Sequence, residues 1–65
     1  ESARWLRRRG TALSPLRPAG IAEIDGARVD VVSEGGFIEA GAAIEVTRAE
    51  GYRIVVRRLP PNQGE

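Results

Sequence analysis

Apolar and polar residues alternate on both sides of the dipeptide Asp25-Gly26, a pair that favours a tight type I′ turn. A two-residue loop at this position sets Ile24 opposite Ala27 and fixes the pairing of both strands from there. The other face of the hairpin then carries Glu23 across from Arg28, an opposite-charge pair. The residues of the first face are all small or apolar: Gly20, Ala22, Ile24, Ala27, Val29 and Val31. The pattern therefore predicts a hairpin with one buried face.

A second hairpin is predicted over residues 44–57, and its register depends on the length of its loop. A two-residue loop formed by Glu50 and Gly51 would place charged residues on both faces. A three-residue loop, Ala49-Glu50-Gly51, avoids this and requires Gly51 in the left-handed conformation. The aliphatic residues then share one face in two cross-strand pairs, Val46 with Ile54 and Ile44 with Val56. We therefore predict the three-residue loop.

The remaining segments predict one further strand and irregular connections. Residues 11–14 are the candidate first strand, and the two prolines that follow suggest an edge strand or an irregular lead-in to the sheet. Residues 33–41, "SEGGFIEAG", are too short for a regular helix, and their Gly-Gly pair predicts a compact turn. With two strands in each hairpin, the count is five. This predicts a small all-β barrel or sandwich, and a closed barrel would leave no exposed sheet edge.

The compact turn contains a bulky apolar pair, Phe37 and Ile38, where a loop is normally polar. Two interpretations are open. The pair closes one end of the barrel, which is the interpretation we favour, or one of the two side chains projects as an apolar contact for a partner. Burial distinguishes them, because a plug is buried. Arg53 and Arg57, on the outer face of the second hairpin, complete the candidate partner contacts.

The composition argues against catalysis. The chain of 65 residues contains no His, Cys or Lys, so it has no side chain suited to act as a base near neutral pH. Its serines, Ser2, Ser14 and Ser33, therefore have no general base to activate them. Without imidazole or thiolate, no metal site is expected. The sequence predicts a protein that is not an enzyme and has no cofactor and no small-molecule ligand.

The sequence ends differ in composition from the centre. Residues 4–9, "RWLRRR", combine Trp5, which we expect outside the barrel, with four Arg. Such a segment is either a juxtamembrane anchor at anionic headgroups or a disordered basic end. The last residues are polar and rich in Pro. We predict a juxtamembrane or disordered basic segment over 1–9, a barrel domain over 10–59 and a disordered tail over 60–65.

The sequence over residues 16–59 resembles the C-terminal soluble domain of the NfeD-like family of membrane proteins. The resemblance rests on the order and spacing of "LRPAG", "IDGARVDVVSEGGFIEAG" and "EGYRIVVRR". It implies a five-stranded OB-type barrel that lacks the usual helix between strands three and four. It also implies a parent protein anchored in the membrane by segments outside this chain, and a partner among stomatin- or flotillin-like membrane scaffold proteins. The expected function is therefore non-catalytic protein interaction, on the cytoplasmic face suggested by the positive-inside rule.

Binding of single-stranded nucleic acid is the alternative function, because OB barrels commonly perform it with a basic groove and aromatic stacking platforms. All ten cations are Arg, yet the net charge is only +1. Glu45 and Glu50 interrupt the cations of the second hairpin, and the chain has one Trp, one Tyr and one Phe. Nucleic acid is therefore not the favoured partner.

Overall fold

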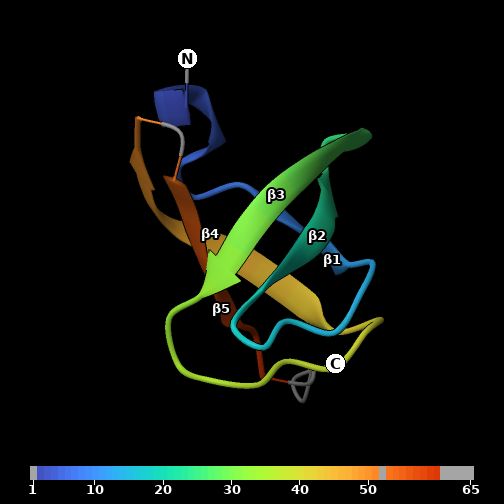
Figure 1. Cartoon of the computed structure of the whole chain (residues 1–65). Coiled ribbons are helices and arrows are strands. Elements are labelled where there is room, and N and C mark those ends of the chain that lie inside the picture. Colours follow the sequence, from blue (N-terminus) through green and yellow to red (C-terminus); the bar gives the residue numbers. More distant parts are fainter. Residues whose placement is uncertain (1, 52, 61–65) are drawn as a thin grey trace.

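The computed structural model describes residues 2–51 and 53–60 of the chain. Five strands form one closed barrel in the order β1-β2-β3-β5-β4, with no helix in the described connection 34–42 (Figure 1). This confirms the predicted all-β barrel of OB type. The elements are a 3-10 turn η1, Ser2–Trp5, and the strands β1, Arg9–Ala12; β2, Ala19–Ile24; β3, Ala27–Ser33; β4, Ala43–Glu50; and β5, Arg53–Arg58.

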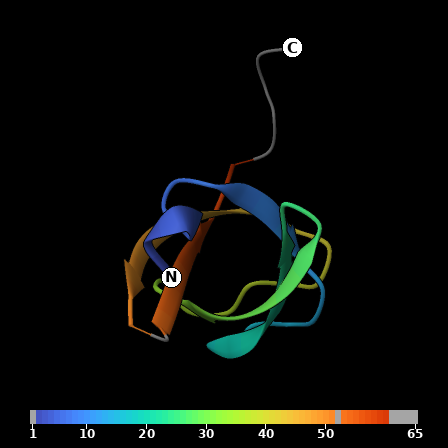
Figure 2. The same cartoon turned by 90° about the horizontal axis from the view of Figure 1, so that it is seen from above.

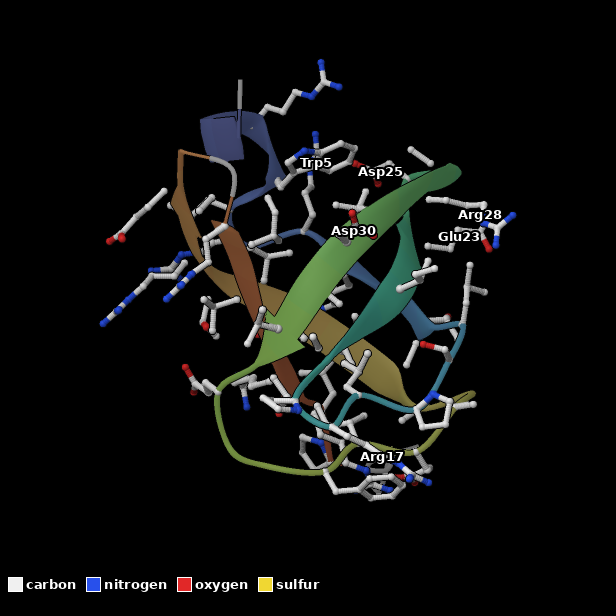
Figure 3. All side chains as sticks on the ribbon, in the orientation of Figure 1. Trp5, Arg17, Glu23, Asp25, Arg28 and Asp30 are labelled. Atoms are coloured by element: carbon white, nitrogen blue, oxygen red, sulfur yellow. The ribbon has the colours of Figure 1, made fainter. Side chains whose placement is uncertain are left out.

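The β2–β3 hairpin has the predicted register. Ile24 pairs with Ala27, and the pairing continues to Ala19 opposite Val32. Asp25 and Gly26 both have positive φ, 52° and 81°, as a type I′ turn requires. Glu23 lies directly across from Arg28, and Figure 3 shows their side chains next to one another. Local turn chemistry and the alternating pattern were sufficient to predict the register of this hairpin, because both specify the same pairing.

The predicted three-residue loop between β4 and β5 is wrong. The pairing continues to Glu50 opposite Arg53, and Val46 lies opposite Val56. A bulge between Val46 and Arg48 takes up the extra residue that we had assigned to the loop. The aliphatic residues of both strands still share the buried face, as predicted. Gly51 has the expected positive φ, 58°.

The first strand also differs from the prediction of residues 11–14. β1 spans Arg9–Ala12 and pairs with β2 on one side and with β4 on the other, so it is not an edge strand. The two prolines fall in the connection to β2, where they remove no hydrogen bond from the sheet. A Cβ atom at Gly10 would overlap the carbonyl oxygen of Glu23. Glycine at this position therefore lets β1 close the barrel against β2.

Trp5 does not lie outside the barrel, contrary to our expectation. Its side chain is half-buried and packs against the core. The backbone N–H of Arg7 donates to the carbonyl of Val46 at 3.0 Å, which holds the segment before β1 against β4. Seen from above, η1 lies over one side of the ring of strands (Figure 2). The indole therefore helps to cover one end of the barrel.

The core consists of small and aliphatic side chains that point inward from all five strands and from the connections. Its buried residues are Ala12, Leu16, Ala22, Ile24, Val31, Ile38, Ala42, Ile44, Val46, Ile54 and Val56. The boundaries of the basic segment and the barrel domain stay predictions, although β1 begins at Arg9. Of the predicted tail, residues 61–65 lie outside the described residues. Among the residues described, no helix has the length and apolar character needed to cross a membrane.

Candidate functional site

The connection between β3 and β4 is held to the barrel by backbone hydrogen bonds. Leu16 N donates to Ile38 O at 2.8 Å, and Ile38 N donates to Leu16 O at 3.1 Å. Further along, Gly41 N donates to Ala12 O at 2.7 Å. At its start, Glu34 N donates to Val56 O on β5 at 2.9 Å. The turn is therefore attached at its beginning, its middle and its end.

Phe37 and Ile38 have opposite environments. Ile38 is 3% exposed and belongs to the core, whereas Phe37 is 60% exposed. Our favoured interpretation, that the pair closes the barrel, is thus wrong for Phe37 and applies to Ile38 alone. The reason is local: Ile38 forms a bridge with Leu16, and neighbouring residues in an extended segment point to opposite sides.

Arg17 covers one side of the exposed phenyl ring. Its guanidinium carbon lies 5.5 Å from the ring centroid of Phe37, a cation–π distance. Figure 3 shows Arg17 at the end of the barrel opposite Trp5. Because the bridge between Leu16 and Ile38 is antiparallel, Arg17, which follows Leu16, is held close to Phe37, which precedes Ile38. The ring is therefore both exposed and oriented.

Glu39 and Arg58 form an ion pair beside this turn. The guanidinium donates two hydrogen bonds, Nη2 to Oε2 at 2.7 Å and Nε to Oε1 at 3.3 Å. The side-chain hydrogen bond from Arg58 is the main cause that lowers the pKa of the Glu39 carboxyl below its ordinary value. Both groups are exposed to solvent, so the contact orients two charges rather than contributing much to stability.

The structure brings some of the predicted contact residues together and separates others. A shallow hollow is lined by Phe37 and Ile38 together with Arg57 and Arg58 at the end of β5. Arg57 is also paired with Glu45, Nη2 to Oε1 at 2.9 Å. Arg53 lies at the start of β5, toward the opposite end of the barrel (Figure 1). Phe37 and Arg57 therefore belong to one surface and Arg53 to another.

Sequence reasoning did not single out Arg17, Glu39 or Arg58 as parts of this surface. They are scattered along the chain, and single charged residues in a small domain carry no signal of their own. Within the described residues, no group of three or more acidic side chains gathers where a metal ion could be held. The arrangement at the turn is an apolar ring with charged neighbours, a combination suited to contact with another molecule.

Comparisons with known proteins agree with this fold. The sequence pattern of the family described as "NfeD-like C-terminal, partner-binding domain" matches residues 3–58. The chain is 50% identical over 50 residues to the membrane protein NfeD1b of Bacillus subtilis (strain 168), which covers 77% of this chain and 11% of that relative. The chain thus spans only about a tenth of the length of this curated relative.

A solved structure is also similar, the C-terminal domain of stomatin operon partner protein 1510-C from Pyrococcus horikoshii. It superposes with a TM-score of 0.84 at 24% sequence identity, over 92% of this chain and 95% of that chain. At this identity the likeness establishes the shared fold.

Proposed function

The chain belongs to the NfeD-like family, through the domain described as C-terminal and partner-binding, and from this premise we propose that it binds a protein partner without catalysing a reaction. The contact surface in this proposal is the end of the barrel that carries Phe37. The expected absence of catalysis rests on the residue types present, since no side chain is suited to act as a base near neutral pH.

The observation that carries the proposal is the exposed Phe37 on an attached turn. Burying a large apolar ring contributes strongly to binding, and aromatic residues are common among the few that dominate an interface. A ring held by its backbone and by Arg17 loses little conformational freedom on binding. The structure of the turn therefore favours contact over a role in folding for this side chain.

Charged residues around Phe37 supply the polar rim that protein interfaces require. Arg17 stacks on the ring, and Glu39 and Arg58 hold each other in a fixed orientation at the same end of the barrel. Arg57 lines the hollow beside Phe37 and is a further candidate contact. Ile38 is inside the core and supports the surface from below.

We place the partner among stomatin- or flotillin-like membrane proteins. Two relatives support this: the related solved structure belongs to a stomatin operon partner protein, and the Bacillus subtilis relative is a membrane protein. In this proposal the parent protein is anchored by segments outside this chain. Residues 1–9 then lie next to the membrane, residues 10–59 form the binding domain, and the Arg-rich start favours the cytoplasmic face.

The test measures binding of this domain to the purified soluble part of a stomatin-like protein from the same organism. Phe37→Ala should weaken binding by at least about thirtyfold, as expected for the loss of a dominant aromatic contact. The matched control is Leu6→Ala, which shortens another apolar side chain that is 46% exposed and does not line the hollow beside Phe37. It should change the affinity by less than about twofold.

Two results would contradict the proposal. One is a stomatin-like protein that binds Phe37→Ala as tightly as the unchanged domain. The other is submicromolar binding of a single-stranded oligonucleotide whose affinity falls steeply with salt, which would favour the nucleic-acid function instead.

A further inference from the structure

The barrel has a seam between β3 and β5. These parallel strands pair at only two positions, Val32 with Val55 and Ser33 with Val56. From there they diverge toward their first residues (Figure 1). Residues 27–31 of β3 consequently have β2 on one side and no strand of the described chain on the other. The closed order of strands thus contains a free strand edge over residues 27–31 of the seven-residue strand β3.

The pairing of β2 with β3 determines which backbone groups face the seam. In an antiparallel pair, residues that exchange hydrogen bonds alternate with residues that do not. The two-residue turn makes Ile24 and Ala27 a hydrogen-bonded pair, so Val29 and Val31 also bond to β2. The N–H and C=O groups of Arg28 and Asp30 therefore point away from β2. Within the described chain, no loop or turn donates to them or accepts from them.

A groove of about 550 Å³ begins beside this edge. Its floor and walls are largely apolar, and it crosses from β2 over β3 to the start of β5. The lining residues are Ala19, Gly20, Ile21, Asp30, Val31, Val32, Arg53 and Ile54. Asp30 and Arg53 are the two charged members, one on each strand of the seam, and neither forms an ion pair with any described residue. The groove therefore offers an apolar surface that includes one negative and one positive side chain, neither of which is in an ion pair with a described residue.

We propose that this groove binds an extended peptide segment of a protein partner, which adds as a strand to the free edge of β3 at Arg28 and Asp30. Strand addition uses the backbone groups of an exposed edge for affinity and side-chain pockets for specificity. The segment that fits alternates apolar and polar residues. It carries a basic side chain next to Asp30 and an acidic one within reach of Arg53.

The geometry also limits the position of the added segment. Since β3 and β5 run parallel to one another, the segment has the same orientation relative to both strands. The segment has to end where Val32 and Val55 meet, because the strands are joined there. This inference rests on the proposed partner-binding function and adds a second contact to it, on a different side of the barrel from Phe37.

Hydrogen exchange tests the premise in the free domain. The backbone amides of Arg28 and Asp30 should exchange at least about tenfold faster than those of Val29 and Val31, since only the latter bond to β2. Equal protection of all four amides would overturn the inference, because the edge would not be free.

The binding test uses a displayed library of random linear peptides, so that it does not depend on the identity of the partner. The most enriched peptide should alternate apolar and charged residues, and when bound it should slow exchange of the Arg28 and Asp30 amides by at least about tenfold. Arg53→Glu should weaken this peptide by at least about tenfold. The control Arg48→Glu, on β4 outside the groove, should leave its affinity within about twofold.

A proline pair separates loss of binding from loss of folding. Asp30→Pro removes an N–H that faces the seam, so the domain should stay folded and lose the peptide. Val31→Pro removes an N–H bonded to β2 and should unfold the domain. If Asp30→Pro also unfolds it, the Arg53→Glu result and the exchange pattern of the unchanged domain decide.

Each remaining outcome has a clear meaning. Failure to enrich any peptide, or a peptide that binds without protecting Arg28 and Asp30, overturns the inference. Protection that grows with protein concentration and needs no peptide would also overturn it, in favour of pairing with a second copy. A stomatin-like protein that binds through Phe37 while these two amides stay exposed preserves the proposed function and rejects this contact. If the peptide adds to β3 but the domain does not bind the stomatin-like protein, this contact is preserved and the proposed function is rejected.

Discussion

Leu16 and Ile38, 22 residues apart in the sequence, form an isolated antiparallel bridge in which each backbone N–H donates to the carbonyl of the other, at 2.8 and 3.1 Å. Both side chains are buried. The bridge attaches the β3–β4 connection to the β1–β2 connection at one end of the barrel. It also directs the preceding residue, Phe37, outward.

Ile38 and Phe37 should therefore differ sharply when each is shortened. Ile38→Ala removes a side chain that is 3% exposed and should lower the free energy of unfolding by about 2–5 kcal/mol. Phe37→Ala removes a ring that is 60% exposed and should change it by less than about 1 kcal/mol, mostly through the contact with Arg17. Denaturant unfolding of both variants tests this. A large loss for Phe37→Ala would mean that the ring is part of the core after all.

Gly51 should be sensitive to a β-branched residue because of its backbone conformation and not because of space. Its φ is 58°, and a Cβ atom there would have no neighbour within 4 Å. Gly51→Val should cost about 1–3 kcal/mol of stability through strain in the left-handed region. Gly51→Asn, which tolerates this region, is the control and should cost clearly less. Similar melting temperatures for the two variants would argue against the strained conformation.

Gly10 should be sensitive to any added side chain because of space and not because of its backbone conformation. A Cβ atom there would overlap the backbone oxygen of Glu23 on the neighbouring strand, and backbone cannot move aside as a side-chain end can. Gly10→Ala should cost about 1–3 kcal/mol or more, through separation of β1 from β2. Gly35→Ala, in the β3–β4 connection, adds the same methyl group where nothing lies within 4 Å. Thermal melts should show a large loss for the first variant alone, and equal losses would contradict the close approach.

The Glu39–Arg58 pair should be visible in a pH titration. The hydrogen bond from Arg58 lowers the pKa of Glu39 in the folded state. The pair therefore contributes stability above the ordinary pKa of a Glu, and this contribution disappears as the pH falls through the lowered folded value. NMR titration of the Glu39 carboxyl carbon should give a midpoint below the ordinary Glu value, and Arg58→Gln should raise it. Arg48→Gln should leave the Glu39 midpoint where it was, and an equal rise in both variants would exclude a specific pair.

Part of the candidate site could be predicted from the sequence. The turn at 33–41 was recognisable by its Gly-Gly pair, and Phe37 was conspicuous as the only Phe of the chain. The exposure of Phe37 could not be predicted from the sequence, because it depends on the bridge between Leu16 and Ile38, two residues from different connections. The same holds for Arg17, which reaches the ring only through that bridge. Contacts between distant connections have no local pattern from which they could be predicted.

The sequence by itself determined the β2–β3 hairpin, because Asp25 and Gly26 fix the turn and a shift of one residue would expose the buried face. It also determined which aliphatic residues of β4 and β5 face the core. Only the tertiary structure decided that the extra residue of β4 forms a bulge between Val46 and Arg48. The three-residue loop and the bulge bury the same side chains, so the hydrophobic pattern cannot distinguish them. The choice depends on how β4 must bend to pair with β1 as well as with β5.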